Sequence, residues 1–261
     1  MDIKELNINN EQHTTKNHPW EYARAKVIIH LLQKFLKKKK SLQYAIDIGC
    51  GDTFFLKQFC KKYCVNEAIA VDTAFDDTLI AKLKEKNPKI TFVNNIDDIR
   101  LHATSTADVI FLMDVIEHIE DDIAFLKRLR EADFISKDTL FVITVPAFNR
   151  LYCSHDKWLG HYRRYSQKTL QLAIQQAGLK SVHRGYFFTT LFFMRIIQKI
   201  LEKIKGEPIH APNGIGGWRG GVFISKLYEW FLLCDYYFFS IFLFFGIRLP
   251  GLSTFSICQK Q

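Results

Sequence analysis

The stretch Tyr44-Ala45-Ile46-Asp47-Ile48-Gly49-Cys50-Gly51-Asp52 decides the fold of this chain. It is an apolar run of strand-forming residues that ends in an acid and breaks at two glycines, and a helical pattern of apolar and lysine positions follows it. The pattern predicts a strand, a tight turn and a helix. Glycine at such a turn lets the backbone pass close under a ligand, because a Cβ would occupy that space.

The glycine turn differs from a dinucleotide-binding turn. A G-x-G-x-x-G fingerprint that begins at Gly49 requires a glycine at position 54, where this chain has Phe54. Asp47 lies just before the turn, where a carboxylate would repel a phosphate and suit an ammonium group. The sequence therefore favours a ligand whose part nearest the turn is cationic.

Composition and charge set the broad class. The chain has 261 residues, of which 48% are apolar, and we interpret it as one domain with an insertion. The net charge of +9 favours an anionic partner, but no basic face accompanies a nucleic-acid motif, which makes nucleic acid unlikely. Six scattered cysteines without a C-x-x-C pair, and a beginning without signal-peptide features, favour the cytoplasm.

The domain division follows from the pattern along the chain. Residues 1–40 contain a polar arm and, from Pro19, an amphipathic helix, and residues 41–261 form the main domain. Apolar strands alternate with helical segments there, which predicts a parallel, doubly wound sheet whose ligand lies beyond the carboxyl ends of the strands. After the strand at Tyr44, we expect strands at Glu67–Asp72, Lys89–Asn94, Ala107–Met113, Thr139–Val145, Ser181–Tyr186 and Leu252–Cys258.

Acids follow two of these strands. Asp72 comes after Gly51 at close to the roughly 20-residue spacing at which a carboxylate accepts hydrogen bonds from a ribose diol. Alternatively, Asp72 caps a helix that begins near Phe75. Asp114, Glu117 and His118 follow the fourth strand; we interpret them as a cap and a solvated first turn. We expect no metal there, because no second His or Cys stands at ligand spacing.

The segment from Ala147 to Tyr165 shows no periodicity, and a loop of this length in a compact domain is usually functional. His155 and His161 are candidate general bases, since imidazole titrates near neutral pH. Asp156 is a third catalytic candidate, which could orient one of them. Alternatively, these polar residues pin the loop to the domain.

The same segment ends in two adjacent arginines and a tyrosine. Arg163, Arg164 and Tyr165 are candidate substrate-binding residues, because guanidinium groups suit phosphates and carboxylates. The alternative is that the arginines pair with acids of the domain itself.

Taken in order, these motifs resemble those of one enzyme family. Asp47-x-Gly49-x-Gly51, Asp72, Asp114-x-x-Glu117-His118 and Val145-Pro146-Ala147 resemble successive motifs of the class I S-adenosylmethionine-dependent methyltransferases. The resemblance covers nearly the whole chain. It implies a Rossmann-like doubly wound sheet of seven strands, the seventh antiparallel. The apolar segments before the last strand predict a helical insertion between strands six and seven.

Further motifs are similar to those of a bacterial subgroup associated with cell-surface glycan and lipid-linked saccharide pathways. They are Ser154-His155-Asp156, the run from Gly160 to Ser166, and His18-Pro19-Trp20 together with Arg24.

The resemblance implies S-adenosylmethionine as the cofactor and gives its site. Gly49, Cys50 and Gly51 would lie under its methionine part, with Asp47 on the ammonium group and Asp72 on the ribose hydroxyls.

Two further residues complete the implied cofactor site. Asn95 would accept a hydrogen bond from the adenine amino group, and Asp114 would also bind the cofactor. The chain departs from the family pattern at Thr53, which replaces a frequent third glycine, and at Asn95, which replaces an acid.

The insertion at residues 187–250 is rich in aromatic and aliphatic residues. Its charge-free run from Tyr236 to Ile247 is shorter than the roughly 20 residues of a bilayer span, so we expect no transmembrane helix. We expect a loop at Gly206–Gly221. The flanking helices either cap the site internally or rest on a membrane, which would place the protein at the inner face of the membrane.

The sequence thus predicts an S-adenosylmethionine-dependent methyltransferase whose acceptor is amphipathic or phosphorylated, and lipid-linked or glycan-related. Two alternatives stay open. One is a methyltransferase of a soluble small metabolite, and the other is a membrane-associated binding protein of the same fold without turnover. The oligomeric state and the acceptor atom do not follow from the sequence.

Overall fold

The computed structural model describes residues 18–103, 105–206, 218 and 220–261. Within them, seven strands form one sheet in the order β3-β2-β1-β4-β5-β7-β6. The pairs from β3 through β5 are parallel, and β7 runs antiparallel to both β5 and β6. The predicted Rossmann-like sheet with an antiparallel seventh strand is confirmed. The N-terminal arm and most of the expected loop at 206–221 lie outside the described residues.

The strand ends differ from the predicted ones by no more than two residues. The strands are β1 (Leu42–Ile48), β2 (Val65–Val71), β3 (Ile90–Val93), β4 (Val109–Met113), β5 (Leu140–Pro146), β6 (Leu179–Phe187) and β7 (Ser253–Lys260). The helices are α2 (Pro19–Leu36), α3 (Phe54–Lys62), α4 (Asp77–Lys86), α5 (Ile99–His102), α6 (Asp122–Glu131), α7 (Ser154–Leu159), α8 (Gln167–Gln176), α9 (Thr189–Lys205) and α10 (Val222–Phe244), with short 3-10 turns η1 (Ile96–Asp98), η2 (Ile116–His118) and η3 (Asn149–Leu151).

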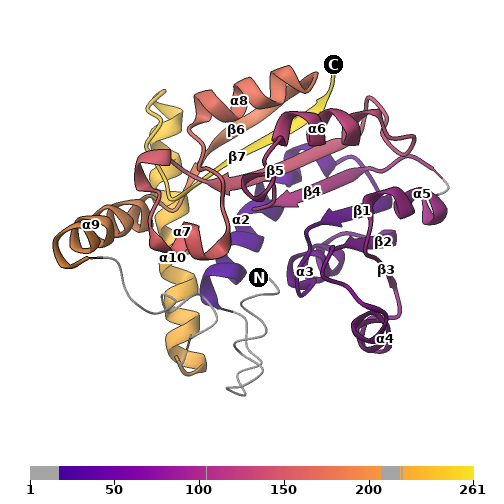
Figure 1. The fold of residues 1–261 in the computed structure, drawn as a ribbon, viewed down its shortest axis with the longest axis horizontal. Coiled ribbons are helices and arrows are strands. Elements are labelled where there is room, and N and C mark those ends of the chain that lie inside the picture. The colour runs from indigo at the N-terminus through magenta and orange to yellow at the C-terminus, as the bar shows by residue number, and fades with distance from the viewer. Residues whose placement is uncertain (1–17, 104, 207–217, 219) are drawn as a thin grey trace.

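Helices cover both faces of the sheet (Figure 1). One buried cluster joins α2, α3 and α10 to one face, and a second joins α5, α6 and α8 to the other. Alternate residues of β1 enter the two clusters, for example Ala45 the first and Ile46 the second. Burial on both faces explains why the central strands are almost entirely apolar.

The predicted helix that begins at Pro19 is part of this core. Its N-terminus is closed by a capping box, in which the His18 ring accepts a hydrogen bond from the Trp20 N–H and the Glu21 carboxylate accepts one from the His18 N–H. The stripe that includes Val27 and Ile28 is buried in the same cluster as α3. The helix is therefore integrated with the sheet, and it brings its first turns to the carboxyl edge of the strands.

The segment expected as an irregular loop contains two short helices, η3 and α7, and this corrects the prediction. The Asp156 carboxylate accepts a hydrogen bond from the Cys153 N–H at the start of α7, and Gly160 ends the helix with a φ of +79°. The helix has six residues. That is shorter than the window over which a helical period can be recognised.

The insertion consists of α9 and α10, which project beyond the sheet (Figure 1). The expectation that no transmembrane helix is present rested on the length of the run after Tyr236, and the helix is longer than that run. α10 has 23 residues and continues through Lys226, Glu229 and Asp235; by length and composition alone it could cross a membrane.

The acids of α10 face the domain. Glu229 pairs with Lys26 of α2 and with Lys226, and Asp235 accepts hydrogen bonds from the N–H groups of Thr189 and Thr190 at the start of α9. Both acids are buried. A charged residue that turns inward does not interrupt the helix or its outer apolar surface.

Candidate functional site

The glycine turn lies at the carboxyl edge of the sheet, between β1 and α3. Gly49 and Gly51 have φ values of +69° and +53°, in the left-handed region that favours glycine. A Cβ at Gly49 would approach Cγ2 of Val115 to 2.7 Å. The turn therefore needs glycine both for its backbone conformation and for its close approach to the segment after β4.

Asp47 is a fully buried acid next to this turn. Its Oδ1 has no hydrogen-bond partner among the described residues. Burial raises the pKa of Asp47 to about 7, with the positive charge of Arg24 opposing and the negative charge of Asp72 adding to the shift. A buried carboxylate oxygen without a donor is costly, so this site fits a cationic or hydrogen-bond-donating ligand group.

Asp72 holds the glycine turn. Its carboxylate accepts hydrogen bonds from the Gly51 N–H at 2.9 Å and the Ala74 N–H at 3.0 Å. The alternative role as a helix cap is wrong, because Asp76 caps α4 by accepting from the Leu79 N–H. The proposed contact of Asp72 with a ribose remains a prediction.

The other predicted cofactor residues lie near the same edge. Asn95 follows β3, and its side-chain oxygen accepts a hydrogen bond from the Asp97 N–H at 3.0 Å. Cys50 is buried in the turn, and burial raises the pKa of its thiol. Thr53, in place of a third glycine, has a φ of +61° and is fully buried. Thr53 thus adopts a backbone conformation that favours glycine, although it has a side chain.

Asp114 follows β4 and forms an ion pair with Arg24 of α2. It also accepts a hydrogen bond from the Thr144 hydroxyl at 3.1 Å. Arg24 lies over the Trp20 ring, with its guanidinium carbon 4.4 Å from the ring centroid. The sequence indicated Arg24 only as part of a motif. The feature of the sequence that could have indicated a role for Arg24 in the site is its charge, because Arg24 lies on the largely apolar, buried stripe of α2.

Glu117 is fully buried in η2, so its interpretation as part of a solvated first turn is wrong. Neither of its carboxylate oxygens has a hydrogen-bond partner among the described residues. Burial, and then the negative charge of Asp114, raise the pKa of Glu117 well above its usual range. The site thus contains a second buried acid that lacks partners.

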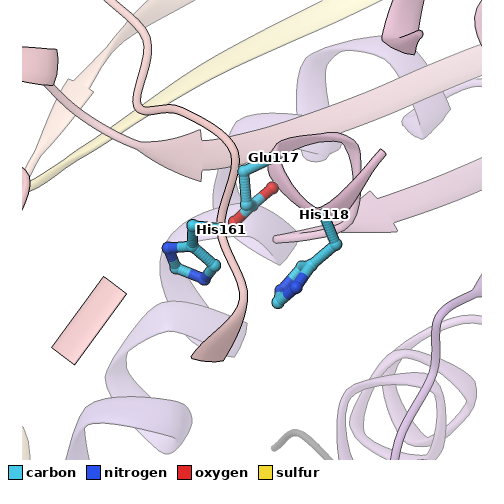
Figure 2. A group of neighbouring side chains, drawn as sticks. All are labelled: Glu117, His118 and His161. Atoms are coloured by element: carbon cyan, nitrogen blue, oxygen red, sulfur yellow. The ribbon is translucent and has the colours of Figure 1, made fainter. Parts of the chain in front are cut away.

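His161 lies beside Glu117 and His118 (Figure 2). One ligand atom of each of the three side chains lies within 4.8 Å of the others. The rings of His118 and His161 are edge to face, with their centroids 4.6 Å apart. The expectation that no second histidine accompanies His118 is therefore wrong. No histidine stands near His118 in the sequence, but His161 lies beside it in the folded protein.

Asp156 orients His161. Its buried carboxylate accepts hydrogen bonds from His161 Nδ1 at 2.8 Å, from Arg164 Nε at 2.7 Å and from the Cys153 N–H at 2.9 Å. Burial would raise the pKa of Asp156, but the His161 hydrogen bond and the Arg164 charge together hold it well below its usual range. Asp156 is thus an ionised acid whose oxygens are engaged within the protein.

His155 has a different environment from His161. It stacks on Trp158, with a centroid distance of 6.0 Å. Burial, with a further contribution from the Arg195 charge, lowers the pKa of His155 to about 4. At neutral pH this ring is neutral and is a weak proton acceptor.

The predicted substrate-binding residues fasten their segment to the domain. Arg163 donates to the carbonyl oxygens of Ile119 and Glu120, and it forms an ion pair with Asp122. Arg164 pairs with Asp156, and the Tyr165 hydroxyl donates to Asp122 at 2.6 Å. The arginines therefore make the internal pairs that the sequence left open as their alternative role.

Comparisons with known proteins agree with this geometry. A family model described as a methyltransferase domain matches residues 20–184. No curated protein sequence matches the chain. A putative sarcosine dimethylglycine methyltransferase from Galdieria sulphuraria has a similar structure, with a TM-score of 0.55 and 10% identity over 91% of this chain and 86% of that one.

Two other solved structures show how far the likeness extends. The plantazolicin methyltransferase BamL, in complex with a triazolic desmethylPZN analog and SAH, gives a TM-score of 0.54 and 15% identity over 99% of this chain and 90% of that one. The cyclase SpnF gives 0.51 and 11%, over 89% and 79%. At these identities the likeness shows the fold alone, and a fold does not fix a reaction.

Proposed function

We propose an acceptor for this chain, which belongs to the methyltransferase-domain family and is a class I S-adenosylmethionine-dependent methyltransferase. The acceptor in this proposal is amphipathic and is reached at a membrane surface, as a lipid-linked or glycan-related compound would be. The observation that carries the proposal is the exposed apolar surface of α9 and α10. The cofactor and the acceptor are taken in turn below.

The glycine turn and its acids fit S-adenosylmethionine. The unpartnered Oδ1 of Asp47 is suited to the ammonium group of an amino acid. Gly49 has no side chain, and its surroundings have no space for one, so none stands between the turn and a ligand. When bound, the cofactor supplies a methyl carbon activated by the adjacent sulfonium. The protein then has to hold the two reactants in line and exclude water, and α2 helps to close this edge of the sheet.

The outer surface of the two inserted helices is apolar. Phe223 and Phe244 of α10 are 80% and 91% exposed, and Trp230 is 64% exposed. Many large apolar side chains exposed along the same two helices indicate a site of membrane or protein contact. The exposed residues are Phe193, Met194, Ile197, Ile200, Leu201 and Ile204 of α9, and Val222, Phe223, Ile224, Leu227, Trp230, Phe231, Tyr237, Phe238, Ile241, Leu243 and Phe244 of α10.

The charges of the insertion support a lipid surface as the occupant. Glu229 and Asp235 turn inward, whereas Lys203 of α9 and Lys226, which also pairs with Glu229, are exposed beside the apolar residues. An apolar surface flanked by cations, in a chain with a net charge of +9, suits anionic lipid head groups. A cleft beside α10, lined among others by Phe239, Leu243 and Arg248, has the mixed character that an amphipathic acceptor needs.

A methyltransferase of a soluble small molecule is the second candidate. It is favoured by structures such as that of BamL, whose complex contains a small-molecule analog. The two candidates differ in one prediction, because a soluble acceptor gives no reason for the protein to bind lipid. A binding protein without turnover is tested separately by its inability to transfer a methyl group.

Vesicle co-sedimentation tests the acceptor proposal. We expect the protein to bind vesicles that contain an anionic lipid. The affinity of the triple variant Phe223→Ser, Trp230→Ser, Phe244→Ser for these vesicles should be lower by about tenfold or more. The matched control is Leu101→Ser with Leu172→Ser, which removes exposed apolar residues from α5 and α8. Equal binding by the triple variant, or no binding by the wild type, would contradict the proposal.

Methyl transfer itself is tested with labelled S-adenosylmethionine and a membrane lipid extract. Label in the organic phase is expected with the wild type and not with Asp47→Ala. Label that enters only soluble metabolites would favour the second candidate.

A further inference from the structure

We propose that Glu117, His118 and His161 bind a divalent metal ion of the zinc, manganese or iron type at the acceptor side of the site. Binding of the ion does not depend on the function proposed above, but the role given to the ion rests on it. None of the three residues belongs to the cofactor site that the family resemblance implies.

The donor set is that of a catalytic metal centre. Two imidazoles and one carboxylate leave coordination positions open for water or substrate, as in zinc hydrolases and in iron centres of the facial-triad type. The ligand atoms lie within 4.8 Å of one another, and metal–ligand bonds of about 2.0–2.2 Å require them somewhat closer. The proposal requires small side-chain rotations for this adjustment, and the arrangement favours them because Glu117 and His118 share one short turn and His161 faces them (Figure 2).

The unpartnered carboxylate of Glu117 is the observation that points to a cation. Two neighbouring acids each have an arginine: Asp114 pairs with Arg24, and Asp156 pairs with Arg164. Glu117 is as deeply buried as Asp156, yet both of its oxygens lack a partner among the described residues. A buried carboxylate is stable when it is neutral or bound by a cation. A metal ion held also by the two histidines would supply that cation.

His161 is already oriented for metal binding. Its Nδ1 lies 2.8 Å from the Asp156 carboxylate, so Nδ1 is engaged there and Nε2 is the ring nitrogen left for a metal ion. A carboxylate behind a ligating histidine is the usual second layer of a metal site. Asp156 is itself fixed by Arg164 and by the Cys153 N–H. Asp156 is therefore a positioning residue in this proposal.

The ion gives the site a means of activating a hydroxyl acceptor. In its open position it would hold the acceptor oxygen and lower the pKa of the hydroxyl, whose proton leaves to bulk water. The oxygen then forms the new O–C bond as the C–S bond breaks, and the electron pair of that bond passes to sulfur. The proposal thus narrows the acceptor to an oxygen nucleophile.

Metal content and metal titration test the site without any assay of activity. Purified protein is analysed by elemental mass spectrometry, stripped with chelator and titrated by calorimetry with Zn²⁺, Mn²⁺ and Mg²⁺. We expect one ion per chain and tighter binding of Zn²⁺ or Mn²⁺ than of Mg²⁺. Substitution with Co²⁺ should give a visible absorption band whose intensity reports the coordination number.

Variants locate the site. Glu117→Gln and His161→Asn should each weaken Zn²⁺ binding by about a hundredfold or more, and Asp156→Asn by about ten- to a hundredfold. Glu117→Gln is the decisive variant, because a neutral isostere of a buried acid leaves the fold intact. His102→Gln removes an exposed histidine on α5 and should bind like the wild type. Equal affinity in Glu117→Gln and the wild type would overturn the proposal.

Calorimetry with S-adenosylhomocysteine in the presence of chelator separates the two proposals. Binding of S-adenosylhomocysteine by a protein that takes up none of the three metals at millimolar concentration overturns the metal site and leaves the methyltransferase function standing. Metal binding that Glu117→Gln abolishes, in a protein that binds no S-adenosylhomocysteine, supports the site and contradicts the function.

Discussion

The carboxyl edge of the sheet has two regions that each bury an acid with unpartnered oxygen, and they are assembled in different ways. We call the first the cofactor region, because we propose that the cofactor binds at Asp47; it comes from one strand, one turn and the start of one helix. We call the second the acceptor region, because we propose that the acceptor binds beside Glu117; it combines η2, the segment after α7 and the first turns of α2. The backbone conformation of the turn and the hydrogen bond from the Gly51 N–H to Asp72 hold the first region, and ion pairs hold the second. The difference indicates that the two regions respond to different kinds of substitution.

The ion pairs determine which acids of each region lack a positively charged partner. Arg24 balances Asp114, and Arg164 balances Asp156. Among the described residues of these two regions, Asp47 and Glu117 then remain as buried acids that can receive a cation from outside. In our proposals the cofactor ammonium group meets the first and a metal ion meets the second.

The largest effect should come from breaking the acceptor region at Asp156. Asp156→Asn leaves Arg164 buried without a counter-charge, and we expect it to lower the free energy of unfolding by about 3–5 kcal/mol. The pKa of Asp156 is held below its unfolded value, so its contribution is present at neutral pH and is lost only as the pH falls through the acidic range. Urea unfolding at pH 7 measures the loss.

The matched control is the exposed pair of Asp97 with Arg128. Asp97→Asn should change the free energy of unfolding by less than about 1 kcal/mol, because both partners are largely in water. Similar values for the two variants would contradict the view that buried pairs hold the acceptor region together.

A second, smaller effect sharpens the comparison from the cofactor side. Asp47→Asn removes the negative charge that would pair with the ammonium group and should weaken S-adenosylhomocysteine binding by roughly ten- to a hundredfold. Calorimetry measures this. In the wild type, affinity should rise as the pH increases through about 7, because Asp47 must be ionised, with Arg24 favouring and Asp72 and Asp52 opposing its ionisation.

The same variant should have the opposite effect on the ligand-free protein. The pKa of Asp47 is about 7 in the folded state, above its ordinary value of 3.8, so the folded state keeps a proton that the unfolded state loses. The stability of the wild type therefore falls as the pH rises from about 4 to 7 and then levels off. Asp47→Asn should be the more stable protein at pH 8, by about 1–3 kcal/mol. Lower stability would refute this account of Asp47.

The smallest effect concerns the backbone of the cofactor region. Thr53 has a φ of +61°, where a residue with a Cβ is strained. Thr53→Gly should be more stable than Thr53→Ala by about 1 kcal/mol, the reverse of their order inside a helix. Thermal unfolding of the two variants measures the difference. The opposite order would mean that loss of chain entropy outweighs strain at this turn.

The sequence predicted what depends on neighbouring residues. The alternation of apolar strands with helices predicted the sheet, and Asp47 with two glycines predicted the turn. Even the departure at Thr53 was visible as a missing glycine, although its left-handed backbone was not. Such features are local, because a strand end, its turn and the next helix are consecutive in the chain.

The acceptor region could not be predicted in the same way. Glu117 looks like a solvated acid in sequence, because burial depends on the segment that later covers it. His161 reaches His118 only after α7 has formed and Asp156 has paired with Arg164. Residues that meet from distant segments have no fixed spacing in the sequence by which the contact could be predicted. The inward turn of Glu229 and Asp235 was likewise hidden, and it made α10 look shorter than it is.

The position of β7 in the sheet has a consequence for synthesis of the protein. β7 lies between β5 and β6, yet α9 and α10 precede it in the chain. On the ribosome, β6 therefore emerges long before the strand that pairs with it, and both apolar helices follow before the sheet can close. An open strand edge together with exposed apolar helices promotes aggregation of a nascent chain. The sheet can therefore close only after α9 and α10 have been synthesised.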